Sequence, residues 1–134
     1  MIYLDYSATT PINDEVLDTF VKVSKGFVGN PNSLHKLGVD AKRLIDASTN
    51  QVAEILNVLP KEVIYTSGST EANNLAIKGY CLKHQNRGKH IITTRLEHSS
   101  VTASFSYLQK LGFDVSFIDL DSNGMVTVEE LKKV

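Results

Sequence analysis

The ten residues Tyr65 to Asn74, YTSGSTEANN, decide the fold because they join an apolar run to a helical pattern through a glycine turn. The run that ends there, Glu62 to Thr66, is short and rich in β-branched and aromatic residues, so it predicts a strand. The pattern that follows, Thr70 to His84, predicts a helix. A strand that leads into a helix is typical of crossovers between parallel strands, and the stretch therefore favours an α/β fold.

The same alternation extends along the chain. Two further strands are predicted at His90 to Thr94 and Phe113 to Ile118, separated by a helical pattern from Ser99 to Leu111. Earlier residues predict one helix capped by Asn13 that runs to about Lys25, and a longer one from about Leu37 to Leu56 that ends before Pro60. We therefore expect a parallel-type sheet with helices on its faces.

Composition excludes several classes of protein. A chain of 134 residues with 42% hydrophobic content is long enough to bury a core. The net charge of -1, with both signs interspersed, gives no footprint for nucleic acid or for an anionic membrane. No signal-peptide pattern and no run of ~20 apolar residues is present, and the lone Cys81 cannot form an internal disulfide. A cytoplasmic protein is expected.

The glycine turn also has the parts of a phosphate site. Gly68 would allow close approach of a ligand, and the free N–H groups and hydroxyls of Ser69 and Thr70 would point out of the helix start. An ordinary helix cap uses the same residue types, and spacing alone does not separate the two interpretations. The turn has neither the lysine of a Walker loop nor a full dinucleotide glycine pattern, which favours a phosphorylated group other than a nucleotide.

A histidine follows the next predicted strand. His98 would emerge at the same sheet edge as the Gly68 turn if the two strands are adjacent. An imidazole there could stack on a planar ligand or exchange protons near neutral pH. The alternative is that His98 is a surface residue that caps the following helix.

Four motifs carry a family resemblance. They are YLDYSATTP (3–11), GNPNSLHKLG (29–38), TSGSTEANNLAIKG (66–79) and LEHSSV (96–101). In this order and rough spacing they resemble the N-terminal part of cysteine desulfurases, which are class V aminotransferase enzymes that depend on pyridoxal 5'-phosphate. The resemblance covers essentially the whole chain. It implies a fold type I architecture, with residues 1–33 as an arm, helix and loop and residues 34–134 as the start of the large cofactor-binding domain.

The resemblance also assigns residues. It places Ser69 and Thr70 on the cofactor phosphate, and His98 on the pyridine ring with a suspected role in proton transfer. The lysine that holds the cofactor and the cysteine that accepts sulfur fall beyond residue 134 in the family. Lys36 follows a Ser-Leu-His run that superficially matches the lysine motif, but we expect a solvated helix residue there, and we expect Cys81 to be a structural thiol in mid-helix.

The implied reaction removes sulfur from L-cysteine to give L-alanine and an enzyme persulfide, which serves iron–sulfur cluster or thiolated tRNA synthesis. The implied partners are a sulfur-acceptor protein or scaffold, and either a second copy in a homodimer or a companion chain. The chain alone is expected to be inactive. A non-catalytic binding or assembly module is the alternative, and selenocysteine lyases share similar motifs.

A calcium site is the rival from another class. Residues 119 to 130, DLDSNGMVTVEE, fit an EF-hand loop at each diagnostic position. The preceding Phe113 to Ile118 alternates as a strand does, whereas an EF-hand requires a helix there. A polar turn at Asp121 to Gly124 is the simpler interpretation. The histidines have no zinc-ligand spacing.

Overall fold

The computed structural model of the chain describes residues 2–134. They form two compact units, one up to Ile64 and one from Tyr65 onward, which we describe separately. This division lies at a different place from the predicted division after residue 33. The latter concerned the domains of a longer enzyme and stays a prediction.

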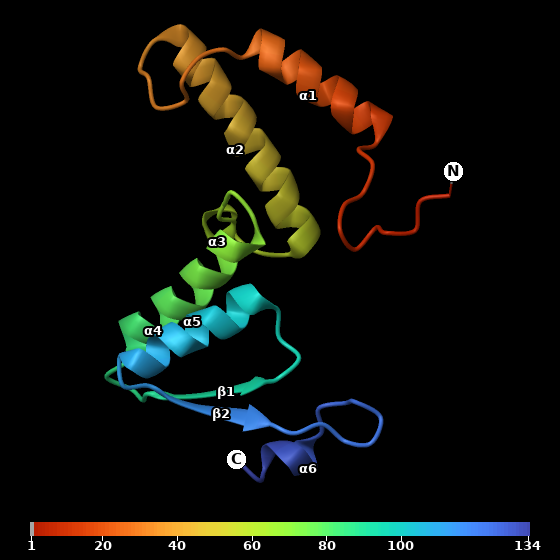
Figure 1. The fold of residues 1–134 in the computed structure, drawn as a ribbon. Helices are drawn as coiled ribbons and strands as arrows, with labels where there is room; N and C mark the ends of the chain where they lie inside the picture. The colour runs from red at the N-terminus through yellow and green to blue at the C-terminus, as the bar shows by residue number, and fades with distance from the viewer. Residues whose placement is uncertain (1) are drawn as a thin grey trace. The chain divides into compact units, whose positions relative to one another are not determined.

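The first unit consists of two helices and a short 3-10 turn (Figure 1). Helix α1 spans Asp14–Gly26, and the Asn13 side chain accepts hydrogen bonds from the backbone of its first turn, as predicted. Helix α2 spans Lys36–Leu56 and ends at Asn57, whose φ of 53° is left-handed. The 3-10 turn η1, Pro60–Glu62, follows at once. A left-handed residue ends a helix by turning its backbone out of the helical path.

Two glycines, one in the loop between α1 and α2 and one in the first turn of α2, lie so close to neighbouring backbone that no side chain would fit. A Cβ on Gly29 would lie 2.3 Å from the carbonyl oxygen of Leu37, and a Cβ on Gly38 would lie 2.3 Å from that of Ser33. Both neighbouring atoms belong to the backbone and cannot rotate away. The loop and the first turn of α2 therefore need glycine at both positions.

Few side chains are buried in this unit. Ala41 and Ala53 of α2 are the buried apolar residues, and α1 buries none. Phe20 on the apolar face of α1 is 67% exposed.

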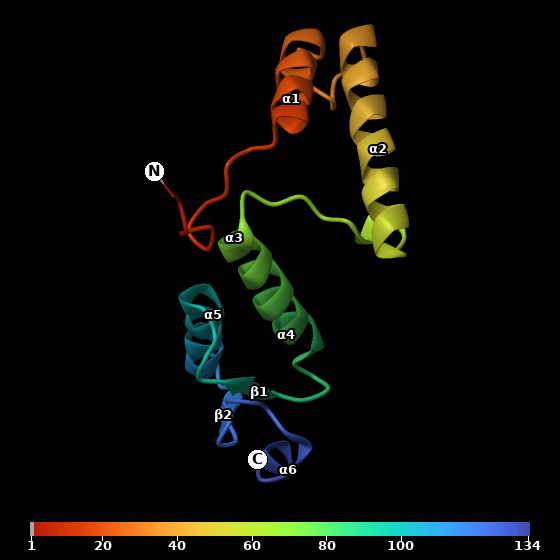
Figure 2. The same cartoon turned by 90° about the vertical axis from the view of Figure 1, so that its right-hand side faces the viewer.

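The second unit contains the sheet. It begins with a continuous helical segment made of α3 (Ser69–Asn73), the π-helical turn η2 (Asn74–Lys78) and α4 (Gly79–His84). Strand β1 (His90–Thr94), helix α5 (Ser99–Lys110), strand β2 (Asp114–Ile118) and helix α6 (Val128–Leu131) follow. Figures 1 and 2 show α4 and α5 on the same side of the two strands.

The two strands are parallel, with His90 opposite Asp114 and Thr94 opposite Ile118. Helix α5 provides the crossover, and Gly112, with a φ of +83°, makes the turn back into β2. Buried residues of α5, of β2 and of the turn between them form the core together with partly buried residues of neighbouring elements; the buried set is Phe105, Leu108, Phe113 and Val115. This confirms the predicted α/β class with parallel strands and covering helices.

The predicted strand at Glu62 to Thr66 is wrong. Glu62 ends η1, and the next residues have extended backbone at Val63 but no strand partner among residues 2–134. Sequence pattern predicts an extended conformation, whereas a strand also requires a neighbour to accept and donate its ladder of hydrogen bonds. Within residues 2–134, no helix is both long and apolar enough to cross a membrane.

Candidate functional site

The Gly68 turn leads into α3, as predicted, and places Ser69 and Thr70 at the first two helical positions, both exposed. No side chain among residues 2–134 caps this helix start. The first N–H groups of a helix have no partner inside the helix, so they remain available to a ligand. Gly68 itself has extended backbone and open space where a Cβ would lie. A glycine there is therefore not required by this chain's own packing.

The carboxylate of Glu71 is hydrogen-bonded to Ser67, the residue before Gly68. Glu71 accepts hydrogen bonds from the backbone N–H and the hydroxyl of Ser67, each at 2.7 Å. The backbone hydrogen bond, and then the hydroxyl bond, lower the pKa of Glu71, while slight desolvation opposes them. Glu71 is thus engaged with Ser67, and no acidic side chain in the described part of the chain is hydrogen-bonded to the hydroxyls of Ser69 and Thr70.

His98 is the N-cap residue of α5 and is exposed as a residue. The loop that delivers it from β1 is pinned by Thr94, whose hydroxyl donates to Glu97 at 3.1 Å and accepts from the N–H of Leu96 at 3.2 Å. Arg95 lies over the ring of Phe117, with 4.8 Å to the ring centroid. These contacts fix the end of β1 and therefore the start of α5.

The structure confirms that His98 caps helix α5 through its side chain. The Nδ1 atom accepts the backbone N–H of Ser100 at 3.2 Å. This role does not exclude a second one, because Nε2 has no protein partner in the described part of the chain. A ring anchored through one nitrogen can present its face and its other nitrogen to a ligand.

The packing of α3 against α5 connects the segment that begins at the Gly68 turn with the segment that begins at His98. Helices α3 and α5 pack against each other and run in the same direction (Figures 1 and 2). The Asn73 amide donates to the Ser100 hydroxyl at 2.9 Å, which ties the end of α3 to the first turn of α5. We expected adjacent strand ends to relate the Gly68 turn to His98, whereas the contact observed between these two segments is the one between Asn73 and Ser100 of the packed helices.

Asn73 and Ser100 were missed by the sequence analysis. Both lie in the quoted motifs, but a contact between residues 27 positions apart leaves no local pattern. The sequence held one weak signal for this contact. Helical spacing places two asparagines and two serines at positions that would face a neighbouring helix, where apolar residues are the usual choice; they are Asn73, Asn74, Ser100 and Ser104.

Two residues that resemble catalytic ones in type, Lys36 and Cys81, lie in helices, as predicted. Lys36 is the exposed first residue of α2, and Cys81 is half-buried within α4. Desolvation raises the pKa of the Cys81 thiol, which disfavours the reactive thiolate.

The EF-hand-like stretch forms a polar turn. The Asp121 carboxylate accepts the backbone N–H of Met125 at 2.8 Å and that of Asn123 at 2.9 Å. The bond from Met125 is the main cause that lowers the pKa of Asp121; desolvation opposes it, and the bonds from Asn123 lower the pKa further. Strand β2 precedes the stretch, and residues 2–134 contain no cluster of three potential metal-binding side chains.

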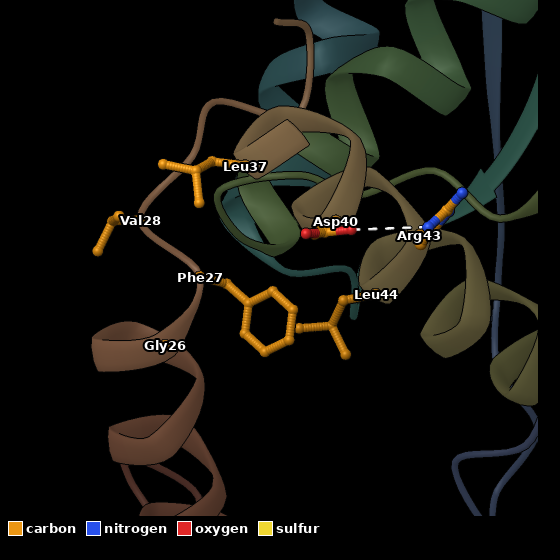
Figure 3. Close-up of a pocket in the computed structure, with 7 residues that line it drawn as sticks. All are labelled: Gly26, Phe27, Val28, Leu37, Asp40, Arg43 and Leu44. Atoms are coloured by element: carbon orange, nitrogen blue, oxygen red, sulfur yellow. Dashed lines mark ion pairs between the residues drawn. The ribbon is translucent and has the colours of Figure 1, made fainter. Parts of the chain in front are cut away.

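A separate pocket lies in the first unit, between the end of α1 and the start of α2. Figure 3 shows the ring of Phe27 turned toward Leu44, with Leu37 nearby. An ion pair between Asp40 and Arg43, 3.6 Å apart, lies on its wall. None of the residues predicted to bind a ligand lines this pocket, and its mostly apolar wall offers no nucleophile or histidine.

Comparison with known proteins identifies the family. The model of the aminotransferase class-V family matches residues 2–134. The cysteine desulfurase IscS of Shewanella loihica is 42% identical over 134 residues, which cover 98% of this chain and 33% of that protein. The chain belongs to the class-V aminotransferase family, which confirms the resemblance carried by the four motifs.

Solved structures agree. A NifS-like protein superposes with a TM-score of 0.93 at 37% identity, covering 99% of this chain and 36% of the other. A structure described as SspA in complex with cysteine gives a TM-score of 0.88 at 30% identity, covering 98% and 38%. The chain thus spans about a third of the length of the relatives it matches. The roles of Ser69, Thr70 and His98 stay predictions.

Proposed function

We propose that this chain supplies part of the cofactor site of a cysteine desulfurase that uses pyridoxal 5'-phosphate. The observation that carries the proposal is the helix start at Ser69 and Thr70, which lacks a side-chain cap among residues 2–134 and is tied through Asn73 and Ser100 to the exposed residue His98. A phosphate binds well at free N–H groups beside hydroxyls, and a planar pyridine stacks on an imidazole. The family match makes this cofactor the best fit.

Each residue has a distinct part. The hydroxyls and backbone N–H groups of Ser69 and Thr70 would anchor the phosphate, while Glu71 stays bonded to Ser67. His98 would hold the pyridine ring flat and exclude water from one face. The cofactor, when bound, serves as an electron sink for bonds at the amino-acid substrate.

The substrate and partners belong to the same proposal. The names of the relatives, which are cysteine desulfurases, point to L-cysteine as the substrate. We propose that the reaction releases alanine and transfers sulfur to an acceptor protein or scaffold. Neither the cofactor-holding lysine nor the sulfur-accepting cysteine is assigned within the 134 residues. We propose that a homodimer partner or companion chain takes part, in the cytoplasm, and that the 134-residue chain alone does not desulfurate cysteine.

The phosphate role can be tested without catalysis. The 134-residue chain would be titrated with pyridoxamine 5'-phosphate, which has no aldehyde to react with lysines, and with pyridoxamine as the phosphate-free comparison. We expect phosphate-dependent shifts of the Ser69 and Thr70 amide signals in NMR spectra. Replacing both residues with alanine should abolish them, whereas Ser99→Ala, at the exposed start of α5, should not. Equal shifts with both ligands would contradict the proposal.

The assignment to a desulfurase needs the native material. We would treat it with borohydride and measure the intact mass of every polypeptide. A pyridoxyl phosphate adduct on a longer or second chain, together with this one, would support the proposal. Steady production of alanine from cysteine by the isolated 134-residue chain would refute the expectation that it is inactive alone.

A further inference from the structure

A chain of three hydrogen-bonding groups runs from α3 to the ring of His98. The Asn73 amide nitrogen donates to the Ser100 hydroxyl oxygen at 2.9 Å, and that oxygen lies 2.9 Å from Nδ1 of His98. The backbone N–H of Ser100 reaches the same Nδ1 at 3.2 Å. Ser100 is only 6% exposed, so its hydroxyl depends on these partners rather than on water.

The direction of these bonds determines where the imidazole proton lies. A backbone N–H can only donate, so Nδ1 must offer its lone pair to Ser100. Asn73 donates to the Ser100 oxygen and thereby leaves the hydroxyl hydrogen free to point at Nδ1. In the neutral ring, both donors therefore favour the tautomer that carries its proton on Nε2.

We propose that Asn73 and Ser100 are positioning residues that hold His98 in the Nε2–H tautomer and fix its ring plane. The chemical meaning of this arrangement rests on the proposed function. In that setting Nε2 meets the ligand as a hydrogen-bond donor, and His98 cannot take up a proton at Nε2 while this arrangement holds. For Nδ1 to accept a proton instead, the ring would have to leave the N–H of Ser100.

A neighbouring pair provides a matched control. Asn74 directly follows Asn73, and Ser104 lies four residues after Ser100 on α5. These two residues join the same two helical segments. There the serine hydroxyl is the donor: it bonds the Ser100 carbonyl at 3.0 Å and approaches the Asn74 side-chain oxygen at 3.5 Å. This pair has the same residue types but does not reach His98.

The tautomer can be measured directly. The 134-residue chain would be labelled with ¹⁵N in its histidine rings, and long-range proton–nitrogen NMR spectra recorded at alkaline pH distinguish protonated from unprotonated ring nitrogens. His84, whose ring lies tilted against that of Tyr80 and has no ring-nitrogen hydrogen bond in the described structure, is the internal reference. We expect the ratio of Nε2–H to Nδ1–H at His98 to exceed that at His84.

Substitutions make the test specific. Asn73→Asp replaces the donor with a carboxylate that only accepts, so the Ser100 hydroxyl should turn toward it and offer its lone pair to Nδ1. The ratio at His98 should fall roughly fivefold, as expected for one net hydrogen bond exchanged. Asn74→Asp adds the same charge one residue away and should leave the ratio unchanged. Ser100→Ala, which keeps the backbone donor but removes the hydroxyl, should lower the ratio without reversing it.

Two results would overturn the inference. One is a ratio at His98 in the unsubstituted chain that equals or falls below that of His84. The other is an equal change in Asn73→Asp and Asn74→Asp, which would mean that charge alone acts. The measurement needs no cofactor, so it can fail while phosphate binding succeeds, and it can succeed while phosphate binding fails.

Discussion

Replacing Gly38 with alanine should destabilise the first unit, although alanine is normally the better helix former. Gly38 is the third residue of α2 and is buried. A Cβ at this position would lie 2.3 Å from the carbonyl oxygen of Ser33, 2.6 Å from that of Asn30 and 2.8 Å from Cβ of Ser33. The two oxygens are backbone atoms, so the loop itself would have to move.

The expected magnitude follows from three effects. Forcing a methyl group into a filled space costs about 1–3 kcal/mol. Moving the loop also weakens the 2.9 Å hydrogen bond from the Ser33 N–H to the Asn30 carbonyl, at about 1 kcal/mol. Alanine returns about 1 kcal/mol of helix propensity. The net loss of unfolding free energy is about 1–3 kcal/mol.

Urea unfolding followed by amide NMR signals from the first unit would measure this loss. With a slope of about 1 kcal/mol per molar urea, the midpoint should fall by about 1–3 M. Gly79→Ala is the control, because Gly79 begins α4 with helical backbone and open space around its Cβ position. It should stabilise the second unit by about 0.5–1 kcal/mol. An unchanged or higher midpoint for Gly38→Ala would refute the steric argument.

Three further predictions concern the second unit. Leu108→Ala removes a side chain with 0% exposure from the core and should cost about 3 kcal/mol in urea unfolding, with an effect below 1 kcal/mol counting against this core. The pKa of Glu71 is lowered in the folded chain, so its bonds to Ser67 are present above about pH 4.5 and are lost as the pH falls through the lower folded pKa. Amide hydrogen exchange at Ser67 should therefore rise in that acidic range. The Glu71→Gln variant should not show this pH dependence. Desolvation raises the pKa of Cys81, so iodoacetamide should modify it more slowly at pH 8 than it modifies free cysteine, and an equal or faster rate would contradict the burial argument.

Local sequence signals predicted most of the elements. The start of α1 was predictable because Asn13 caps it through its own side chain, and the start of α5 because His98 does the same. Strand β1 was placed at its observed bounds, since its β-branched residues stand between polar turns. In each case the deciding interactions lie within a few residues of one another.

Nonlocal interactions account for what was missed. The run from Glu62 to Thr66 has strand composition, but its pairing depends on a neighbouring strand that its own residues cannot specify. The bond between Asn73 and Ser100 joins residues on two helices whose packing is not written in either pattern. The sequence proposes Ser69, Thr70 and His98 one by one, and these roles stay predictions, whereas the contact between the two helices that carry them required the structure.

The polar pairs between α3–η2 and α5 also bear on why the site is arranged as it is. Ser104 is fully buried and Ser100 nearly so, yet all buried polar side-chain atoms in residues 2–134 have partners. Such pairs add little net stability compared with apolar side chains of the same shape, but leaving one partner alone is costly. They therefore penalise any slip of one helix along the other. A one-residue slip would turn α5 by about 100° and carry His98 away from the turn at Ser69 and Thr70. The polar contacts thus fix the register that the proposed site needs, a role that apolar packing would fill less specifically.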